Sequence, residues 1–468
     1  MNALTRRELL AGFLSLPVAL SACKRKPKLP PGDLVFRSEL LGHRVRDHKI
    51  ESVAASAWRP AKIVIVGGGV AGLSAAWRLR RAGFDDFTML ELDPAAGGTS
   101  KSGSNAISAY PWGAHYITQP MRENRALISL LAELDVFDGT DPDGERVVRE
   151  EILCRDPQER LFYAGKWHEG LFPHEGASAQ DEADLTAFEA EIDRFASLRD
   201  AKGRRAFAIP VETSSDDAML TELDGIDFAT WLDRKSLRSP RLRWFLDYAC
   251  RDDYGARLED TSAWAGVFYF AGRMKQAGAA AQPVLTWPEG NGRLVAHLSS
   301  SAKGRIQLAT AATEIDPQAD GIHVSALTAD GATFGLVASR VIFAAPQFLA
   351  KAVIRPYRDA PPSYLAAFDT SAWMVANLTL TERPKDRGAK LAWDSVLYDS
   401  PSLGYVSATH QRCIDHGPNV VTYYYPLCDR DTKVARQRLL STDRDAWADI
   451  ALSDLETAHP HIRDQVAR

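Results

Sequence analysis

Residues 62–72 read KIVIVGGGVAG, and this stretch decides the fold of the chain. Residues 62–66 form a short apolar, β-branched run, which is typical of a buried parallel strand. Gly67, Gly69 and Gly72 follow in G-x-G-x-x-G spacing, with Ala71 inside the motif. In that spacing the first glycine allows a tight turn and the second lets a pyrophosphate approach the backbone. The third lets the next helix pack closely against the strand.

The residues after the glycines complete a strand–helix–strand unit. Residues 73–82 predict a helix that ends at Gly83, and residues 87–92 predict a second strand that contains Glu91. The helix N-terminus offers free N–H groups to phosphates, and an acid about 20 residues after the glycines accepts ribose hydroxyls. Glycines used only for packing are the alternative, but that alternative does not explain the acid. The order of these elements predicts a dinucleotide-binding unit.

The run from Glu91 to Gly97-Gly98 resembles the E-x-x-x-x-x-G-G run of one FAD-dependent superfamily, which holds amine oxidases, protoporphyrinogen oxidases and phytoene desaturases. The resemblance implies FAD, with the paired glycines following the pyrophosphate toward the flavin. An arginine usually follows the pair in that superfamily, and this chain has Thr99 instead. One phosphate contact of the family is therefore in doubt.

Four further segments resemble the same superfamily. Residues 110–117 resemble its G-x-H segment beside the isoalloxazine, and residues 287–294 resemble its P-x-G-G-x-x-x-L segment. Residues 341–346 resemble the V-I-x-A-x-P strand that returns to the cofactor domain, and residues 306–315 stand where a strand presents backbone groups to the adenine. The residues expected to contact FAD are Gly67, Gly69, Ala71, Gly72, Glu91, Gly97, Gly98, Thr99, Gly113, Ala114, His115, Ala312 and Ala344.

His115 is the candidate catalytic residue. The resemblance places its strand along the flavin edge, where the imidazole could face the reacting carbon. An unperturbed histidine titrates near pH 6.5, so it could accept a proton during hydride loss. A buried histidine that donates a hydrogen bond to a backbone carbonyl is the alternative.

Two departures from the superfamily stand out. Its amine oxidases commonly carry a lysine bridged by water to flavin N5, but the matching stretch, residues 371–380, has Asn377 and no lysine. The superfamily also ends with a motif that closes over the flavin ribityl chain, and nothing after residue 430 matches it. We therefore expect either a fragment of a longer protein or incomplete flavin binding.

The first residues predict where in the cell the protein is located. Residues 1–22 are expected to be a signal peptide, because Arg6 and Arg7 precede an apolar stretch and resemble a twin-arginine export motif. Residues 20–23 resemble a lipobox, which implies lipidation of Cys23. An ordinary secretory peptide is the alternative. We expect an exported protein of a bacterial cell envelope, on the periplasmic side, with the export machinery and the membrane as partners.

Composition bounds the remaining possibilities. The chain has 468 residues, 45% of them hydrophobic, and a formal charge of −5, so nucleic acid is a poor partner. None of its five cysteines forms a C-x-x-C pair, and no metal site is expected. The aromatic residues of 227–275 are expected to be mainly helix-packing core.

The predicted fold class is α/β, with a Rossmann-like FAD-binding domain on a parallel sheet interleaved with a mixed α+β substrate domain. The predicted segments are 1–22, signal peptide; 23–60, lipid-anchor tether; 61–120, FAD domain; 121–290, helical substrate region; 291–350, return to the FAD domain; 351–430, substrate-domain sheet; and 431–468, C-terminal helix.

Three functions remain open from the sequence. The leading one is an FAD-dependent oxidoreductase that removes hydride from a C–N or C–C bond of an organic substrate, as an amine oxidase does. A desaturase or porphyrinogen-type dehydrogenase acting on a large apolar substrate is the second. A non-catalytic binding protein with a flavin fold is the third. The sequence does not decide the oligomeric state.

Overall fold

The computed structural model describes residues 29–35, 39–47, 52–142, 144–385, 387–414, 416–428 and 431–468. The predicted signal segment, with Arg6, Arg7 and the lipidation site Cys23, lies outside the described residues. Within those ranges no helix is long and apolar enough to cross a bilayer.

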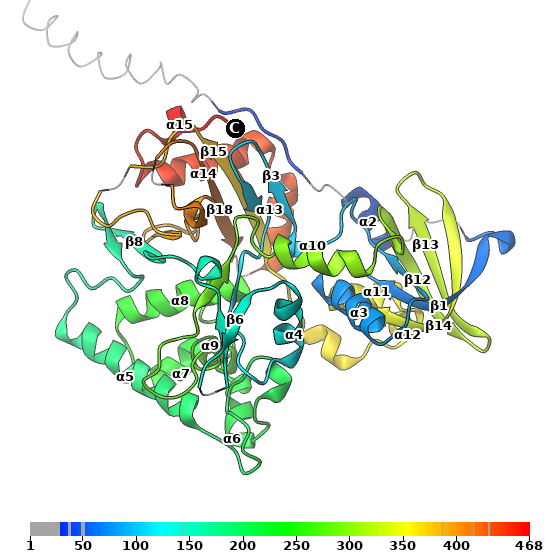
Figure 1. Ribbon diagram of the computed structural model, residues 1–468, viewed down its shortest axis with the longest axis horizontal. Coiled ribbons are helices and arrows are strands. Elements are labelled where there is room, and N and C mark those ends of the chain that lie inside the picture. Colours follow the sequence, from blue (N-terminus) through cyan, green and yellow to red (C-terminus); the bar gives the residue numbers. More distant parts are fainter. Residues whose placement is uncertain are drawn as a thin grey trace, which may run out of the picture.

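A six-stranded sheet forms the unit on the right of Figure 1. Its order is β11-β2-β1-β14-β13-β12, and β11, β2, β1 and β14 run parallel, while β13 and β12 continue as an antiparallel meander. The strands are β1 (Trp58–Val66), β2 (Phe87–Leu90), β11 (Ile306–Gln307), β12 (Thr310–Gln318), β13 (Gly321–Thr328) and β14 (Thr333–Phe343). The sheet confirms the predicted Rossmann-like domain.

The side chains of β1 point alternately to the two faces of this sheet, and both faces are covered. Ile63 and Ile65 pack against α3 (Val70–Arg81), α4 (Arg125–Glu133) and α10 (Gly292–Ser301). Val64 and Val66 lie in the opposite cluster, with the meander, α2 (Glu39–Arg46) and α11 (Ala350–Val353). Successive side chains of a strand point to opposite faces, so this run of four apolar residues needs cover on both sides.

A second six-stranded sheet belongs to the other unit, at the upper left of Figure 1. Its order is β15-β18-β17-β16-β8-β9, so segments about 200 residues apart in the sequence share one sheet. Its strands are β8 (Glu159–Tyr163), β9 (Lys166–Glu169), β15 (Ala372–Leu380), β16 (Asp394–Leu397), β17 (Tyr405–Ser407) and β18 (Asn419–Leu427). The hairpin β8–β9 confirms the one predicted around residues 161–168.

Helices below this sheet form a layer with its own core, which includes Trp231 and Phe228. Most of the predicted aromatic residues of 227–275 therefore pack helices together, as expected. The helices are α5 (Ala179–Ser197), α6 (Ala218–Thr221), α7 (Phe228–Arg234), α8 (Pro240–Tyr254) and α9 (Ala263–Ala271). Short strand pairs join the units: β3 (Ser102–Ser104) with β4 (Ala109–Pro111), β5 (Tyr116–Thr118) with β10 (Val284–Thr286), and β6 (Phe137–Thr140) with β7 (Arg146–Val148).

The structure packs two segments against the cofactor-domain sheet that the sequence assigned to other units. Within the segment 23–60, expected to be a tether, α2 buries Val45 and packs Leu41 against the meander. The cofactor-domain return runs past residue 350, since Ile354 bridges to Ile315 of β12 before α12 (Arg355–Asp359).

Two predicted single elements are each broken in two. The strand expected over 306–315 splits at Ala309, whose φ of +50° turns the chain from β11 into β12. The C-terminal helix is divided into α13 (Thr432–Ser441) and α14 (Arg444–Glu456), and α15 (Ile462–Gln465) follows. Thr442 is extended, and the Asp443 carboxylate accepts the Ala446 N–H at 2.8 Å, so a new N-cap starts α14 there.

Candidate functional site

The glycine loop has the shape that a pyrophosphate needs. Gly67 has φ +105°, and a Cβ there would lie 2.9 Å from the carbonyl carbon of Ala344. A Cβ on Gly72 would overlap the carbonyl oxygen of Gly67, so only glycine lets α3 start so close to β1. A Cβ on Gly69 would meet only the Cα of Gly98, at 3.8 Å.

The open space beside Gly69 lies at a helix N-terminus that has no side-chain cap. Gly69 is the N-cap residue of α3, and among the described residues no side chain caps its first turn. Gly97 has φ +125° and its N–H donates to the Gly68 carbonyl at 2.8 Å, which holds the paired glycines against the loop. Ala71 lies in the first turn of α3. Free N–H groups in an open cradle are a donor set that fits a diphosphate.

Glu91 lies directly after β2, next to this loop. Its carboxylate accepts the N–H of Gly68 at 2.5 Å and that of Asp93 at 2.7 Å, and burial raises its pKa. Lys101 is buried beside it and forms an ion pair with Asp93. Sequence reasoning found no cation to replace the family arginine at Thr99. Lys101 supplies one close by, and its position two residues after Thr99 was the available signal.

Two of the predicted cofactor residues occupy different places along the sheet. The N–H of Ala344 donates to Val66 at 2.8 Å, so this residue borders the glycine turn. Ala312 lies on β12, two residues beyond Thr310, whose N–H donates to the Glu91 carbonyl at 2.8 Å. The adenine side of the predicted site therefore lies at the carboxyl end of β2.

A cavity of about 810 Å³ begins beside the glycine loop at Thr99 and extends along Gly113, Ala114 and His115. Its other walls come from strands β5 and β15, helix α8 and the C-terminal helix α13. Residues of distant segments that line it include Thr99, His115, Tyr116, Asp252, Asp253, Tyr254, Arg273, Trp373, Val375, Tyr424 and Arg436. The predicted flavin-edge segment and a potential substrate space thus share one cavity.

Aromatic rings hold His115 in this wall. Its imidazole stacks on Tyr424 with ring centres 4.8 Å apart, and Trp393 packs on it at 5.3 Å. Nδ1 lies 3.3 Å from the Gly113 carbonyl oxygen, which can only accept, so Nδ1 carries the hydrogen and Nε2 keeps its lone pair. Tyr424 donates to the same carbonyl at 2.8 Å.

Burial lowers the pKa of His115 to about 4, although the hydrogen bond to Gly113 opposes this shift. The pKa lies below the ordinary value near 6.5, because apolar and aromatic neighbours disfavour the imidazolium. At neutral pH the ring is neutral. It can accept a hydrogen bond through Nε2, but it is a weak base.

Asn377 occupies the strand where the family lysine is expected. Its amide donates to the Pro111 carbonyl at 3.0 Å, and its carbonyl accepts from Thr422 at 2.7 Å. Both ends of the side chain thus tie β15 to β18 and to the segment before His115. These hydrogen bonds give Asn377 a structural role.

The cavity also has an acidic wall, which sequence reasoning missed. Asp252 and Asp253 lie in the last turn of α8 and line the cavity. Protein surrounds both side chains, and solvent reaches them through the cavity. Arg273 Nη2 lies 3.0 Å from Asp253 and 3.2 Å from the Tyr116 hydroxyl. The sequence motif R-D-D-Y carried no pattern that distinguished these acids from a solvated helix face.

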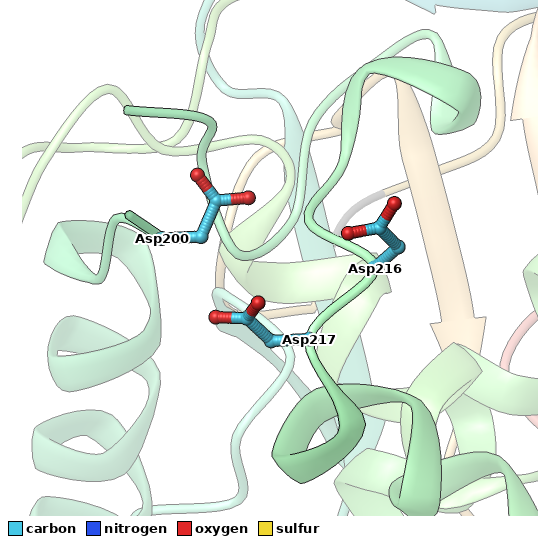
Figure 2. A group of neighbouring side chains, drawn as sticks. All are labelled: Asp200, Asp216 and Asp217. Carbon is cyan, nitrogen blue, oxygen red and sulfur yellow. The ribbon is translucent and has the colours of Figure 1, made fainter. Parts of the chain in front are cut away.

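A separate acidic group lies outside the cavity lining. Figure 2 shows Asp200, Asp216 and Asp217 with their carboxylates turned toward a common space. Arg204 binds two of them, with Nε 2.7 Å from Asp200 and an ion pair to Asp216. The Arg204 guanidinium and the Lys202 ammonium, 3.9 Å from Asp216, offset two of the three negative charges. Among the described residues the four remaining cysteines are all free thiols.

Comparisons with known proteins agree with this geometry. The sequence profile of the family described as flavin containing amine oxidoreductase matches residues 70–466. No curated protein matches the chain.

Solved structures share the fold at low identity. A triple mutant of putrescine oxidase is 16% identical, with a TM-score of 0.61 over 88% of this chain and 85% of that one. Wild-type putrescine oxidase bound to putrescine is 15% identical, with a TM-score of 0.60 over the same shares. Cyclohexylamine oxidase from Brevibacterium oxydans IH-35A is 14% identical, with a TM-score of 0.57 over 88% and 84%.

The glycine cradle beside Glu91 fits FAD, the cavity lining begins at Thr99 next to the paired glycines, and the family profile covers most of the chain. The chain therefore belongs to the flavin-containing amine oxidoreductase family and is an FAD-dependent oxidoreductase of the amine oxidase type.

Proposed function

We propose that this protein oxidises the C–N bond of an amine that enters the cavity as a cation, releases its extra proton to solvent and reacts beside His115 as the neutral amine. The observation that carries the proposal is the cavity itself. One end follows the glycine loop at Thr99, and its walls combine aromatic rings with Asp252 and Asp253. Carboxylates and aromatic faces both attract ammonium groups.

The residues of the chain orient the substrate and exclude water. When bound, FAD supplies the two-electron sink that accepts hydride from the carbon next to nitrogen. The neutral His115 ring can accept an amine N–H at Nε2, which fixes the nitrogen and hence the neighbouring C–H bond. Thr286 Oγ1 donates to the His115 carbonyl at 2.8 Å, and Asn291 Nδ2 donates to the Tyr116 carbonyl at 3.1 Å. The first bond ties the segment around His115 to β10, and the second ties it to the start of α10.

The acidic wall disfavours the alternative of a large apolar substrate. Burying a hydrocarbon against Asp252, Asp253 and Arg273 would remove water from charged groups without replacing its hydrogen bonds. An amine replaces those bonds with its own N–H groups. The polarity of this wall therefore favours C–N over C–C oxidation.

Anaerobic flavin bleaching tests the proposal. The purified holoenzyme is mixed with a panel of primary monoamines, secondary amines and diamines, and the flavin absorbance is followed. We expect at least one amine to reduce the flavin at a saturable rate and to yield an aldehyde or ketone after hydrolysis of the imine. A flavin that stays oxidised with every amine, but is reduced by an apolar polyene precursor or a porphyrinogen, would overturn it.

We also propose that the chain is exported through its twin-arginine segment and anchored by a lipid on Cys23. The support is the sequence alone: Arg6-Arg7 before an apolar stretch, and the lipobox-like run ending at Cys23. Export of a folded protein lets the cofactor be loaded before transport. More than one acyl chain is needed for stable anchoring, and this fits a lipoprotein-type modification.

Fractionation of cells tests this proposed location. Changing Arg6 and Arg7 to Lys is expected to leave precursor in the cytoplasm, and Cys23→Ala is expected to release mature protein from the membrane fraction. Normal envelope levels of the double Lys variant would remove the twin-arginine assignment. Unchanged membrane attachment of Cys23→Ala would remove the lipid anchor.

A further inference from the structure

Helix α13 presents one long face to solvent. The charged side chains of this helix are all cations, namely Lys433, Arg436 and Arg438. Arg438 packs over the rings of Tyr425 and Trp447, so it belongs to the core side of the helix. Lys433 and Arg436 are exposed, and neither side chain makes a hydrogen bond or ion pair with a residue that the structure describes. The exposed face therefore carries two cations that are available to a partner.

Apolar side chains share this face with the cations. Val434 is 55% exposed and Leu440 is 46% exposed. The Thr432 hydroxyl donates to the Asp369 carboxylate at 3.1 Å, and this bond brings the exposed ring of Phe368 to the start of the helix. Exposed apolar side chains beside Lys and Arg are typical of helices that lie in the interface of a membrane.

Acidic side chains lie at the two ends of α13. The Asp431 carboxylate caps the helix and accepts the Lys433 N–H at 2.9 Å, and Asp443 caps the next helix, α14. The partial positive charge of a helix N-terminus offsets a capping carboxylate. Asp445 is paired with Arg444 at 2.8 Å. The middle of the exposed face thus presents positive charge.

The described N-terminal segment lies beside the C-terminal end of the same helix. Arg444, three residues after α13, donates to the Pro30 carbonyl, and Arg468 forms an ion pair with Asp33 at 2.9 Å. Leu29 packs against the core that the second sheet shares with α14. Figure 1 shows this segment passing the C-terminus at the top of the molecule. These contacts fix Leu29 close to the end of α13.

The proposed lipid attachment site is close to this point in the sequence. Leu29 follows Cys23 by six residues, and a chain of that length reaches at most about 20 Å. Four of the five residues 24–28 are Lys or Arg. Helix α13 has ten residues and is therefore about 15 Å long. A lipid on Cys23 would thus hold a bilayer within reach of both the basic segment and the helix.

We propose that the exposed face of α13 lies against an anionic lipid bilayer, as a second contact beside the segment that follows Cys23. This inference rests on the proposed lipid anchor for the location of the protein, and it names the face that is turned to the membrane. Negative headgroups attract Lys433 and Arg436, and Val434 and Leu440 enter the boundary between headgroups and acyl chains.

Vesicle binding without the lipid tests this face. Full-length holoenzyme with Cys23→Ala is sedimented with vesicles of pure phosphatidylcholine and with vesicles that contain about 30% phosphatidylglycerol. The ratio of the two binding constants isolates the effect of anionic lipid, because the apolar stretch of residues 9–22 meets both kinds of vesicle. Each Lys or Arg near an anionic surface strengthens binding about fivefold, so Lys433→Gln with Arg436→Gln should lower this ratio about 25–30-fold.

A matched control removes two exposed cations that lie outside α13. Lys275→Gln with Lys303→Gln makes the same change in net charge and should keep the wild-type ratio. An unchanged ratio in the α13 variant, or an equal loss in both double variants, would overturn the proposal. A loss of self-association in the α13 variant with unchanged vesicle binding would assign the face to a second copy of the chain, and it would also overturn the proposal.

Lipid quenching measures the contact directly. A fluorophore is attached at Gln437→Cys, in the exposed face, after Cys413→Ser has removed the exposed thiol. Brominated lipids in the anionic vesicles should quench it, and they should leave the same label at the exposed Glu212→Cys, in the helical layer, unquenched. No quenching at residue 437, or equal quenching at both positions, would overturn the proposal.

The proposed location and the proposed face fail separately. If cell fractionation finds the protein outside the envelope, the lipid anchor is refuted. Vesicle binding and quenching still decide the face, because neither measurement requires a lipid on Cys23.

Discussion

Two alanine substitutions in the glycine loop should separate cofactor binding from folding. Gly69→Ala adds a methyl group whose nearest neighbour is the Gly98 Cα at 3.8 Å, an ordinary contact, and the φ of Gly69 is −72°, which alanine adopts freely. Gly72→Ala adds a methyl group that overlaps the Gly67 carbonyl oxygen and lies 3.1 Å from its carbonyl carbon. The first change fills the cradle, and the second forces the backbone apart.

The two changes differ in the free energy that each one costs. For Gly72→Ala, the gain in helix propensity is about 1 kcal/mol, whereas overpacking costs about 1–3 kcal/mol. The clash is with backbone that no rotamer can move, so we expect a net loss of roughly 1–2 kcal/mol. For Gly69→Ala, we expect a change in stability within about 0.5 kcal/mol. One lost N–H···phosphate bond, at about 1.5–3 kcal/mol, would weaken FAD binding by about 10–100-fold.

Measuring both variants without cofactor is essential, because bound FAD would itself raise the melting temperature. We expect apo Gly69→Ala to unfold with the wild type and to require at least tenfold more FAD for half-saturation. Apo Gly72→Ala should unfold about 1–2 °C earlier, because the unfolding entropy of a chain of this length amounts to about 1 kcal/mol per degree. Wild-type FAD affinity in Gly69→Ala would refute the placement of the pyrophosphate, and an unchanged melting temperature in apo Gly72→Ala would refute the packing argument.

Three further outcomes follow from individual side chains. Glu91→Gln should raise the Kd for FAD about tenfold, because a charged acceptor next to the loop is lost; saturation measured by flavin fluorescence checks this. His115→Ala should slow flavin reduction about 100-fold with normal FAD content, since a misplaced substrate costs that much, and His115→Gln should recover part of the rate in stopped flow. Burial lowers the pKa of His459 to about 3, so the folded state resists its protonation. The stability due to this group is complete above pH 6.5 and is lost as the pH falls toward 3, by at most about 1.4 kcal/mol per pH unit. Chemical denaturation at pH 7 and pH 5 should show a smaller pH effect in His459→Asn than in wild type.

Local patterns determined the cofactor-binding half of this protein. The strand at residues 62–66, the glycines and the helix ending at Gly83 interact with near neighbours in the chain, so composition and spacing suffice to predict them. Gly83 has φ +80°, as a residue after a helix end requires. The turns at Asp320-Gly321 and Asp330-Gly331 were found for the same reason, and they join the three strands of the meander.

Interruptions within strands, and the packing of elements at the border of the sheet, were less predictable from the sequence. The split at Ala309 depends on β11 pairing with β2, more than 200 residues earlier, and no local signal announces it. The docking of α2 depends on the apolar face of the sheet and its meander, which exists only after these strands have paired. The ion pair between Lys101 and Asp93 was also not predictable, because the glycine loop, and not the spacing of the two residues in the sequence, brings them together.

Only the tertiary structure decided the composition of the cavity. Three consecutive tyrosines, Tyr423, Tyr424 and Tyr425, look equivalent in the sequence, but adjacent residues of a strand face opposite ways. Tyr423 and Tyr425 pack in the core between the second sheet and α14, whereas Tyr424 faces the cavity and stacks on His115.

The register of β18 against β15 sets this choice, because a slip of one residue would exchange the two faces. The position of Asp252 is likewise decided by the tertiary structure, because only the packing of α8 determines which of its turns lines the cavity. The sequence by itself thus determined that a dinucleotide cofactor binds at the glycine loop, because neighbours in the chain build that loop. What faces the cofactor was decided by pairing between segments that are distant in the chain, which no short pattern records.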